Sequence, residues 1–159
     1  MEFTQGVRFD SLGLSPEIMR AIAHRNLEVS TPVQAGCIPP MMAWQDVIAK
    51  APTGTGKTFA YGIPIVEHID PEDETVQAVI LAPTRELAIQ ITGELRDIAA
   101  FKPGVRSVCL YGGQPIGKQI DTLKKRPQIV VATPGRLSDH MKRRTVKVDT
   151  VQTVVLDEA

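Results

Sequence analysis

Apolar residues in this chain fall into short runs, and most of these runs are followed by a turn or by a helix-capping residue. The runs typical of buried strands lie at 46–50, 78–81, 105–111, 129–132 and from Thr153 onward. Between them, apolar residues recur at helical spacing, as in Leu87, Ile91 and Leu95. Alternating strands and helices predict an α/β fold, a parallel sheet with helices on both faces.

Helix-capping signals place the remaining elements. Ser15-Pro16 predicts a helix to about Asn26, and Thr31-Pro32 predicts a second helix that we expect Pro39-Pro40 to end. Further helices are expected at about 57–68, 85–102, 116–123 and 134–144. The chain shows no repeat or low-complexity segment, so we expect residues 1–159 to form one domain.

The segment Ala51-Pro52-Thr53-Gly54-Thr55-Gly56-Lys57-Thr58 joins the first predicted strand to a helix. Glycines there let the backbone curl around a phosphate, and a helix N-terminus favours negative charge. Lys57 can reach the outer phosphates, and the Thr58 hydroxyl can bind magnesium. The pattern has glycine first where this chain has Ala51, but its other positions match. The segment therefore predicts a nucleotide site.

Polar residues also follow each of the later strands. These clusters are Pro83-Thr84-Arg85-Glu86, Gly112-Gly113, Thr133-Pro134-Gly135-Arg136 and Asp157-Glu158. The carboxyl ends of parallel strands meet at one edge of a sheet, where ligands bind. Asp157 can hold magnesium through water, and Glu158 can orient or deprotonate an attacking water. We expect a magnesium-dependent nucleotidase at this edge.

Composition indicates how the protein can hold a polyanion and in which compartment we expect it. Eighteen basic and eighteen acidic residues give a formal net charge of zero, so a polyanion must be held by a local patch. We expect no membrane span and no secretion signal, because no apolar run is long enough and the N-terminus lacks the pattern. Cys37 and Cys109 lack metal-ligand spacing, and two reduced cysteines point to the cytoplasm.

These motifs together resemble those of the DEAD-box ATP-dependent RNA helicases, over essentially the whole chain. The phosphate loop, the three strand-end clusters and Asp157-Glu158-Ala159 each match a motif, although the final aspartate of the last motif is not present. Ser30-Thr31-Pro32-Val33-Gln34 is similar to the segment that reads adenine, with Phe9 as the isolated aromatic upstream. Asn26-Leu27 stands where the family often has a glycine and an aromatic residue.

The resemblance implies a RecA-like phosphate-loop NTPase domain with ATP and Mg²⁺ as cofactors and an adenine-recognition segment at about 9–34. Gln34 would bind the adenine edge and Phe9 would pack near the base. The nucleotide-binding loop would be Thr53, Gly54, Thr55, Gly56, Lys57 and Thr58; Thr58 and Asp157 would hold Mg²⁺; Lys57, Asp157 and Glu158 would be catalytic. RNA would be held, without sequence preference, by Pro83, Thr84, Arg85, Gly112, Gly113, Thr133, Pro134, Gly135 and Arg136.

The resemblance also implies a second RecA-like domain that closes over ATP, for which this chain has no sequence. We therefore expect an ATP-binding half of an RNA helicase, able to bind nucleotide with little hydrolysis. Two alternatives remain: a non-catalytic RNA-binding or adaptor domain on the same fold, and another phosphate-loop NTPase or kinase.

Overall fold

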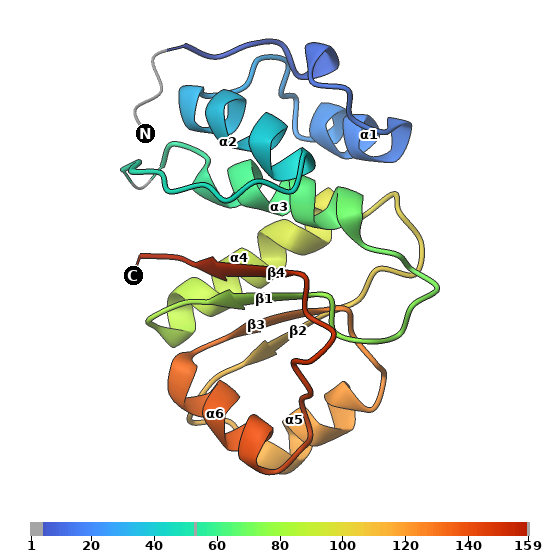
Figure 1. Cartoon of the computed structure of the whole chain (residues 1–159), viewed down its shortest axis with the longest axis vertical. Helices are drawn as coiled ribbons and strands as arrows, with labels where there is room; N and C mark the ends of the chain where they lie inside the picture. Colours follow the sequence, from blue (N-terminus) through green and yellow to red (C-terminus); the bar gives the residue numbers. More distant parts are fainter. Residues whose placement is uncertain (1–4, 53, 159) are drawn as a thin grey trace. The chain divides into compact units, whose positions relative to one another are not determined.

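The computed structural model describes residues 5–52 and 54–158. By its contacts the chain forms two compact units, one comprising the residues up to His68 together with Asp97–Pro103, and the other Ile69–Arg96 and the residues from Gly104 onward. Figure 1 shows the elements of both. None of the helices in the described residues is long and apolar enough to cross a membrane.

The first unit is helical. It contains a short 3₁₀ helix (Phe9–Ser11), α1 (Pro16–His24), α2 (Pro32–Met42) and α3 (Lys57–His68). Ser15 and Thr31 accept hydrogen bonds from the third residues of α1 and α2, so the two predicted caps form. Helices α2 and α3 pack together (Figure 1). The fully buried side chains of this unit include Phe9, Ile18, Ile22, Ile38, Ile63 and Ile65.

Two predictions for this unit are wrong. Residues 46–50 are not a strand: Ile48 is 84% exposed, and no strand of the described sheet pairs with this segment. An apolar run becomes a strand only where a neighbouring strand supplies hydrogen-bond partners. The second helix does not end at Pro39-Pro40 but runs to Met42, because burial of Cys37 and Ile38 outweighs the hydrogen bonds that the prolines remove.

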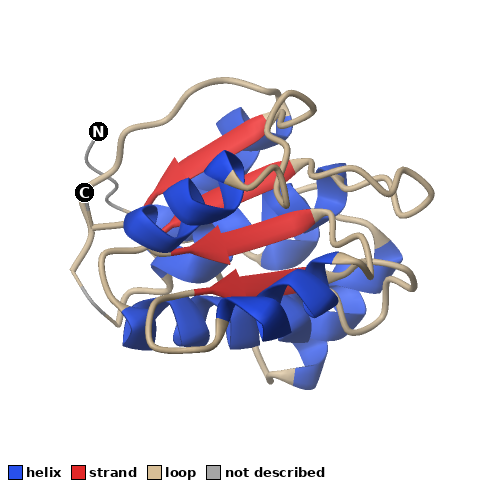
Figure 2. Ribbon diagram, turned by 90° about the horizontal axis from the view of Figure 1, so that it is seen from below, coloured by secondary structure: helices blue, strands red, loops and turns tan. Residues whose placement is uncertain are grey.

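The second unit is built on a four-stranded parallel sheet in the order β2-β3-β1-β4. Its strands are β1 (Ala78–Leu81), β2 (Ser107–Leu110), β3 (Ile129–Ala132) and β4 (Thr153–Leu156). Helix α4 (Arg85–Ile98) lies on one face, and α5 (Ile116–Leu123) and α6 (Pro134–Lys142) lie on the other (Figures 1 and 2). The predicted α/β class, a parallel sheet covered on both faces, is confirmed, with four strands in place of five.

The register of the sheet brings the strand ends to one level. Leu81 pairs with Ala132 and with Leu156, and Leu110 also pairs with Ala132. Each polar cluster of the second unit begins one or two residues beyond such a pair. The sheet itself therefore places these clusters along a single edge, as parallel topology predicts.

Candidate functional site

The phosphate-loop segment has the backbone shape that its glycines predict. Gly54 and Gly56 have φ angles of +86° and +78°, a region that residues with a Cβ rarely adopt. The Thr55 hydroxyl donates to the Pro52 carbonyl at 2.6 Å and closes the turn. A Cβ added at Gly54 would meet no atom within 4 Å, so the loop is open there. The predicted site residue Thr53 lies outside the described residues.

Lys57 and Thr58 form the first turn of α3, and both are half-buried. Backbone N–H groups of a first helical turn have no partner within the helix, so they are available to an anion. The open loop, the two left-handed glycines and a lysine at the helix start therefore fit a bound phosphate chain.

Gln34 is buried, and its carboxamide is used at both ends. Its Oε1 accepts from Thr31 N at 2.9 Å, which completes a capping box, and its Nε2 donates to Gly56 O at 3.2 Å. A Cβ at Gly56 would lie 3.1 Å from the Gln34 Cδ and would collide with the amide nitrogen. Gln34 thus joins the start of α2 to the phosphate loop, a link that the sequence did not predict. Its contact with adenine stays a prediction.

Phe9 is 1% exposed and belongs to the interior of the first unit. Its backbone N–H donates to Glu28 O at 3.0 Å, which holds the 3₁₀ helix against the segment before Ser30. With its ring enclosed, Phe9 has no open face for a base in this structure. Its predicted place near the base stays a prediction.

In the second unit, Thr84 caps α4 by accepting from Leu87 N at 3.2 Å, and Arg85 begins the helix. The Arg85 guanidinium lies over the Tyr111 ring, 5.5 Å from its centroid. Gly113 has φ of +91°. It lies next to Arg85, since a Cβ added at Gly113 would be 3.8 Å from an Arg85 guanidinium nitrogen. The structure therefore brings the first two predicted RNA clusters together, and Pro83, Thr84, Arg85 and both glycines are exposed.

The third cluster opens α6. Thr133 precedes the helix with an extended backbone and makes no capping hydrogen bond through its side chain, and Pro134 and Gly135 are exposed. Arg136 is instead tied to the protein. Its Nη1 donates to Gln114 O at 2.8 Å and to Gln119 Oε1 at 3.2 Å, while its Nε lies 3.6 Å from Asp139 Oδ2.

Two residues beside this cluster are absent from the sequence predictions. Gln119 is 2% exposed and His140 is fully buried, and Gln119 Oε1 lies 2.8 Å from His140 Nε2. Burial first, and then the charge of Arg136, lower the pKa of His140 below its ordinary value. The sequence could have indicated that Gln119 is buried, because it follows Ile116 by three residues and so lies on the apolar face of α5.

Asp157 and Glu158 follow β4 directly. Asp157 is 8% exposed, and its backbone N–H donates to Leu81 O at 2.9 Å, so the strand pairing extends to the carboxylate residue. Glu158 is exposed, with φ of +55°. Among the described residues, no three histidine, cysteine or acidic side chains gather as metal ligands. Magnesium binding by Thr58, in the first unit, and Asp157, in the second, stays a prediction.

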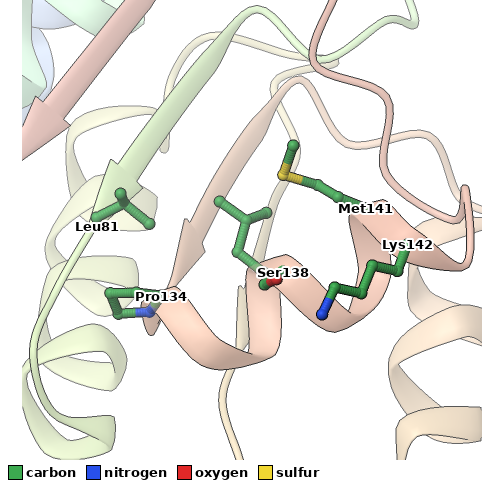
Figure 3. Close-up of a pocket in the computed structure, with 6 residues that line it drawn as sticks. Leu81, Pro134, Ser138, Met141 and Lys142 are labelled. Carbon is green, nitrogen blue, oxygen red and sulfur yellow. The ribbon is translucent and has the colours of Figure 1, made fainter.

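A pocket of about 380 Å³ in the second unit has a different character. It is lined by Leu81, Pro134, Leu137, Ser138, Met141 and Lys142. Figure 3 shows these side chains, which are mostly apolar and come from β1 and α6. Lys142 and Ser138 supply its only polar side chains, and the other four lining residues are apolar.

Comparison with known proteins places these motifs in a family. The family model described as DEAD/DEAH box helicase matches residues 31–159. The chain belongs to the DEAD/DEAH box helicase family.

The relatives of this DEAD/DEAH box helicase chain are considerably longer than the chain. It is 53% identical to the DEAD-box ATP-dependent RNA helicase CshA of Bacillus licheniformis, and 51% identical to that of Bacillus subtilis, in each case over 96% of the chain. The chain spans 31% of the length of either relative. A crystal structure of a DEAD box protein from Methanococcus jannaschii matches 94% of this chain and 40% of its own, with a TM-score of 0.88 and 37% identity.

Asn26 and Leu27 lie just before the residues that the family model matches. Asn26 has φ of +58° directly after the end of α1, a conformation that glycine adopts freely and asparagine tolerates. Asparagine is therefore compatible with the left-handed backbone at this position. Leu27 beside it is 36% exposed and presents an aliphatic surface.

Proposed function

We propose that this chain is the ATP-binding part of an ATP-dependent RNA helicase, which couples ATP binding and hydrolysis to local opening of an RNA duplex. The observation that carries the proposal is the phosphate loop: two left-handed glycines lead into a helix whose first residues are Lys57 and Thr58. Two relatives at 51% and 53% identity are named ATP-dependent RNA helicases, which supports the choice among phosphate-loop enzymes.

In this proposal the loop residues hold the nucleotide. Backbone N–H groups from Gly54 to Thr58 face the phosphates, and Lys57 neutralises the outer ones. Gln34 reads the adenine edge, because a carboxamide can both donate to and accept from the base. Thr53 and Thr55 complete the loop, and Phe9 supports the base region from the interior.

ATP supplies the phosphoryl group, and Mg²⁺ neutralises charge on its phosphates. The Thr58 hydroxyl and the Asp157 carboxylate are the groups that would hold the metal. Glu158 would orient or deprotonate the attacking water. Its exposed position beyond β4 leaves the carboxylate accessible to water.

RNA binding is assigned to the edge at which the strands of the second unit end. Exposed backbone at Pro83, Gly112, Gly113, Pro134 and Gly135, and the polar groups of Thr84, Arg85, Thr133 and Arg136, are suited to phosphates and sugars. Such contacts do not read sequence, so we propose sequence-independent binding. With a net charge of zero, binding should be weak and sensitive to salt.

A second RecA-like domain belongs to the proposal, because an arginine supplied opposite the phosphate loop is worth roughly 10³–10⁵ in rate. We expect this chain by itself to bind nucleotide and to hydrolyse very little. The cytoplasm is the proposed location, because both cysteines are free thiols.

Two measurements on the chain test the proposal. Calorimetry should show binding of ADP in preference to GDP, and a phosphate-release assay should show turnover far below about 1 s⁻¹, unchanged by single-stranded RNA. Failure to bind ADP would refute the nucleotide site. Turnover of about 1 s⁻¹ would show that the chain holds a complete active site and would refute the hypothesis that a second domain is needed.

A further inference from the structure

The two glycines of the second predicted RNA cluster lack side chains that could hold them in place. Both are exposed, and Gly113 has a left-handed backbone. Glycine loses more conformational freedom on ordering than any other residue. A Gly-Gly turn that presents its backbone to a phosphate therefore binds well only if its two flanks are fixed by other groups.

Gln119 fixes both flanks from inside the second unit. Its Nε2 donates to Tyr111 O and to Gln114 Oε1, each at 2.9 Å. Tyr111 and Gln114 are the residues immediately before and after Gly112-Gly113. Because a carbonyl can only accept, the contact with Tyr111 O settles which end of the carboxamide is the nitrogen.

The other end of Gln119 is held by α6. With both Nε2 hydrogens used, Oε1 accepts from Arg136 Nη1 at 3.2 Å and from His140 Nε2 at 2.8 Å. His140 Nε2 must then carry the ring proton, so Nδ1 is the acceptor for the Thr145 hydroxyl at 2.8 Å. Arg136 adds a second tie through Gln114 O.

We propose that Gln119, oriented by His140 and Arg136, is a positioning residue for RNA binding: it sets the Gly112-Gly113 turn relative to the start of α6, where Thr133 lies. This inference rests on the proposed RNA contacts of the strand-end clusters. In this inference Gln119 and His140, two buried residues outside the motifs, hold the Gly112-Gly113 turn and the start of α6 in a fixed relative geometry.

Two substitutions of Gln119 separate this role from general stability. Gln119→Glu keeps an acceptor for Arg136 and His140 but places an oxygen where Tyr111 O needs a donor. Gln119→Met removes all four hydrogen bonds without adding charge, so it controls for electrostatic repulsion of RNA.

Gln128→Glu is the matched control. Gln128 is also fully buried in the second unit, its Oε1 accepts from Arg106 N at 2.7 Å, and its Nε2 donates to Gly104 O at 2.8 Å. It holds a turn that carries none of the proposed RNA contacts. The same chemical change there should cost stability without moving the Gly112-Gly113 turn.

The experiment measures two quantities in the wild-type chain and the three variants. One is hydrogen–deuterium exchange of the segment 111–114; the other is the Kd for a fluorescent oligo-uridine RNA at low salt, by anisotropy. In both Gln119 variants we expect exchange and Kd to rise at least about tenfold. In Gln128→Glu both should stay within about twofold of wild type.

The outcomes distinguish failure of the proposed RNA site from failure of the positioning role of Gln119. If the wild-type chain does not bind the RNA, the proposed RNA site fails and this inference fails with it. If the wild type binds and the Gln119 variants bind equally well, or lose no more than Gln128→Glu, only the positioning role is wrong. Unchanged exchange at 111–114 in the Gln119 variants would also overturn it, whatever the RNA affinity.

Discussion

Replacing Gln34 by alanine tests the most informative contact of the first unit. The substitution removes Oε1 from Thr31 N and Nε2 from Gly56 O. Gly56 O keeps a second donor, Ala60 N at 3.1 Å, whereas Thr31 N loses the partner that completes the capping box. The substitution thus leaves Thr31 N without its side-chain acceptor, whereas Gly56 O keeps its hydrogen bond from Ala60 N.

A typical hydrogen bond contributes about 1 kcal/mol to stability, and a lost cap costs a similar amount. We therefore expect Gln34→Ala to lower the free energy of unfolding by about 1–2 kcal/mol. Chemical denaturation measures this loss. The exposed Gln90 on α4 supplies the control, and Gln90→Ala should change stability by less than about 0.5 kcal/mol.

Nucleotide binding separates the two roles of Gln34. If Gln34 reads the base, calorimetry will show that the preference of the chain for ADP over GDP disappears in Gln34→Ala. If Gln34 only holds the phosphate loop, both affinities will fall by the same factor and the preference will remain. An ADP preference unchanged by the substitution refutes the assignment of Gln34 to adenine.

Three further predictions concern single residues. Lys57→Ala should weaken ATP binding more than adenosine binding, because the ammonium acts on phosphates; equal losses in calorimetry would mean that the fold is damaged. Asn26→Ala should lower the free energy of unfolding by about 1 kcal/mol while Asn26→Gly should not, because φ is +58° there; denaturation curves that coincide for the two variants would contradict this reason. The pKa of His140 is lowered in the folded chain, so the unfolded chain binds a proton more readily below about pH 6.5, and the free energy of unfolding should decrease as the pH is lowered through that range. His140→Gln should flatten this part of the curve of stability against pH. An equally steep curve in the variant would argue against a buried neutral histidine.

The sequence by itself determined the features that depend on neighbouring residues. The capped starts of α1, α2 and α4, the helix after the phosphate loop, and the strands at 78–81 and 129–132 all form as predicted. The placement of the polar clusters at one sheet edge also followed, because parallel strands linked by helices end on the same side. Caps, glycine turns and apolar periodicity act within a few residues, so they are legible in the chain.

Tertiary structure decided which residues gain partners from distant parts of the chain. Residues 46–50 have the composition of a strand but no pairing strand, and Pro39-Pro40 lie inside a helix that packing holds together. Phe9 is enclosed, and Arg136 is bonded to Gln114 and Gln119, twenty-two and seventeen residues away. A sequence shows which groups can donate, accept or pack, but folding decides which of them are used within the protein and which stay available to a ligand, because buried polar groups must find partners wherever the fold places them.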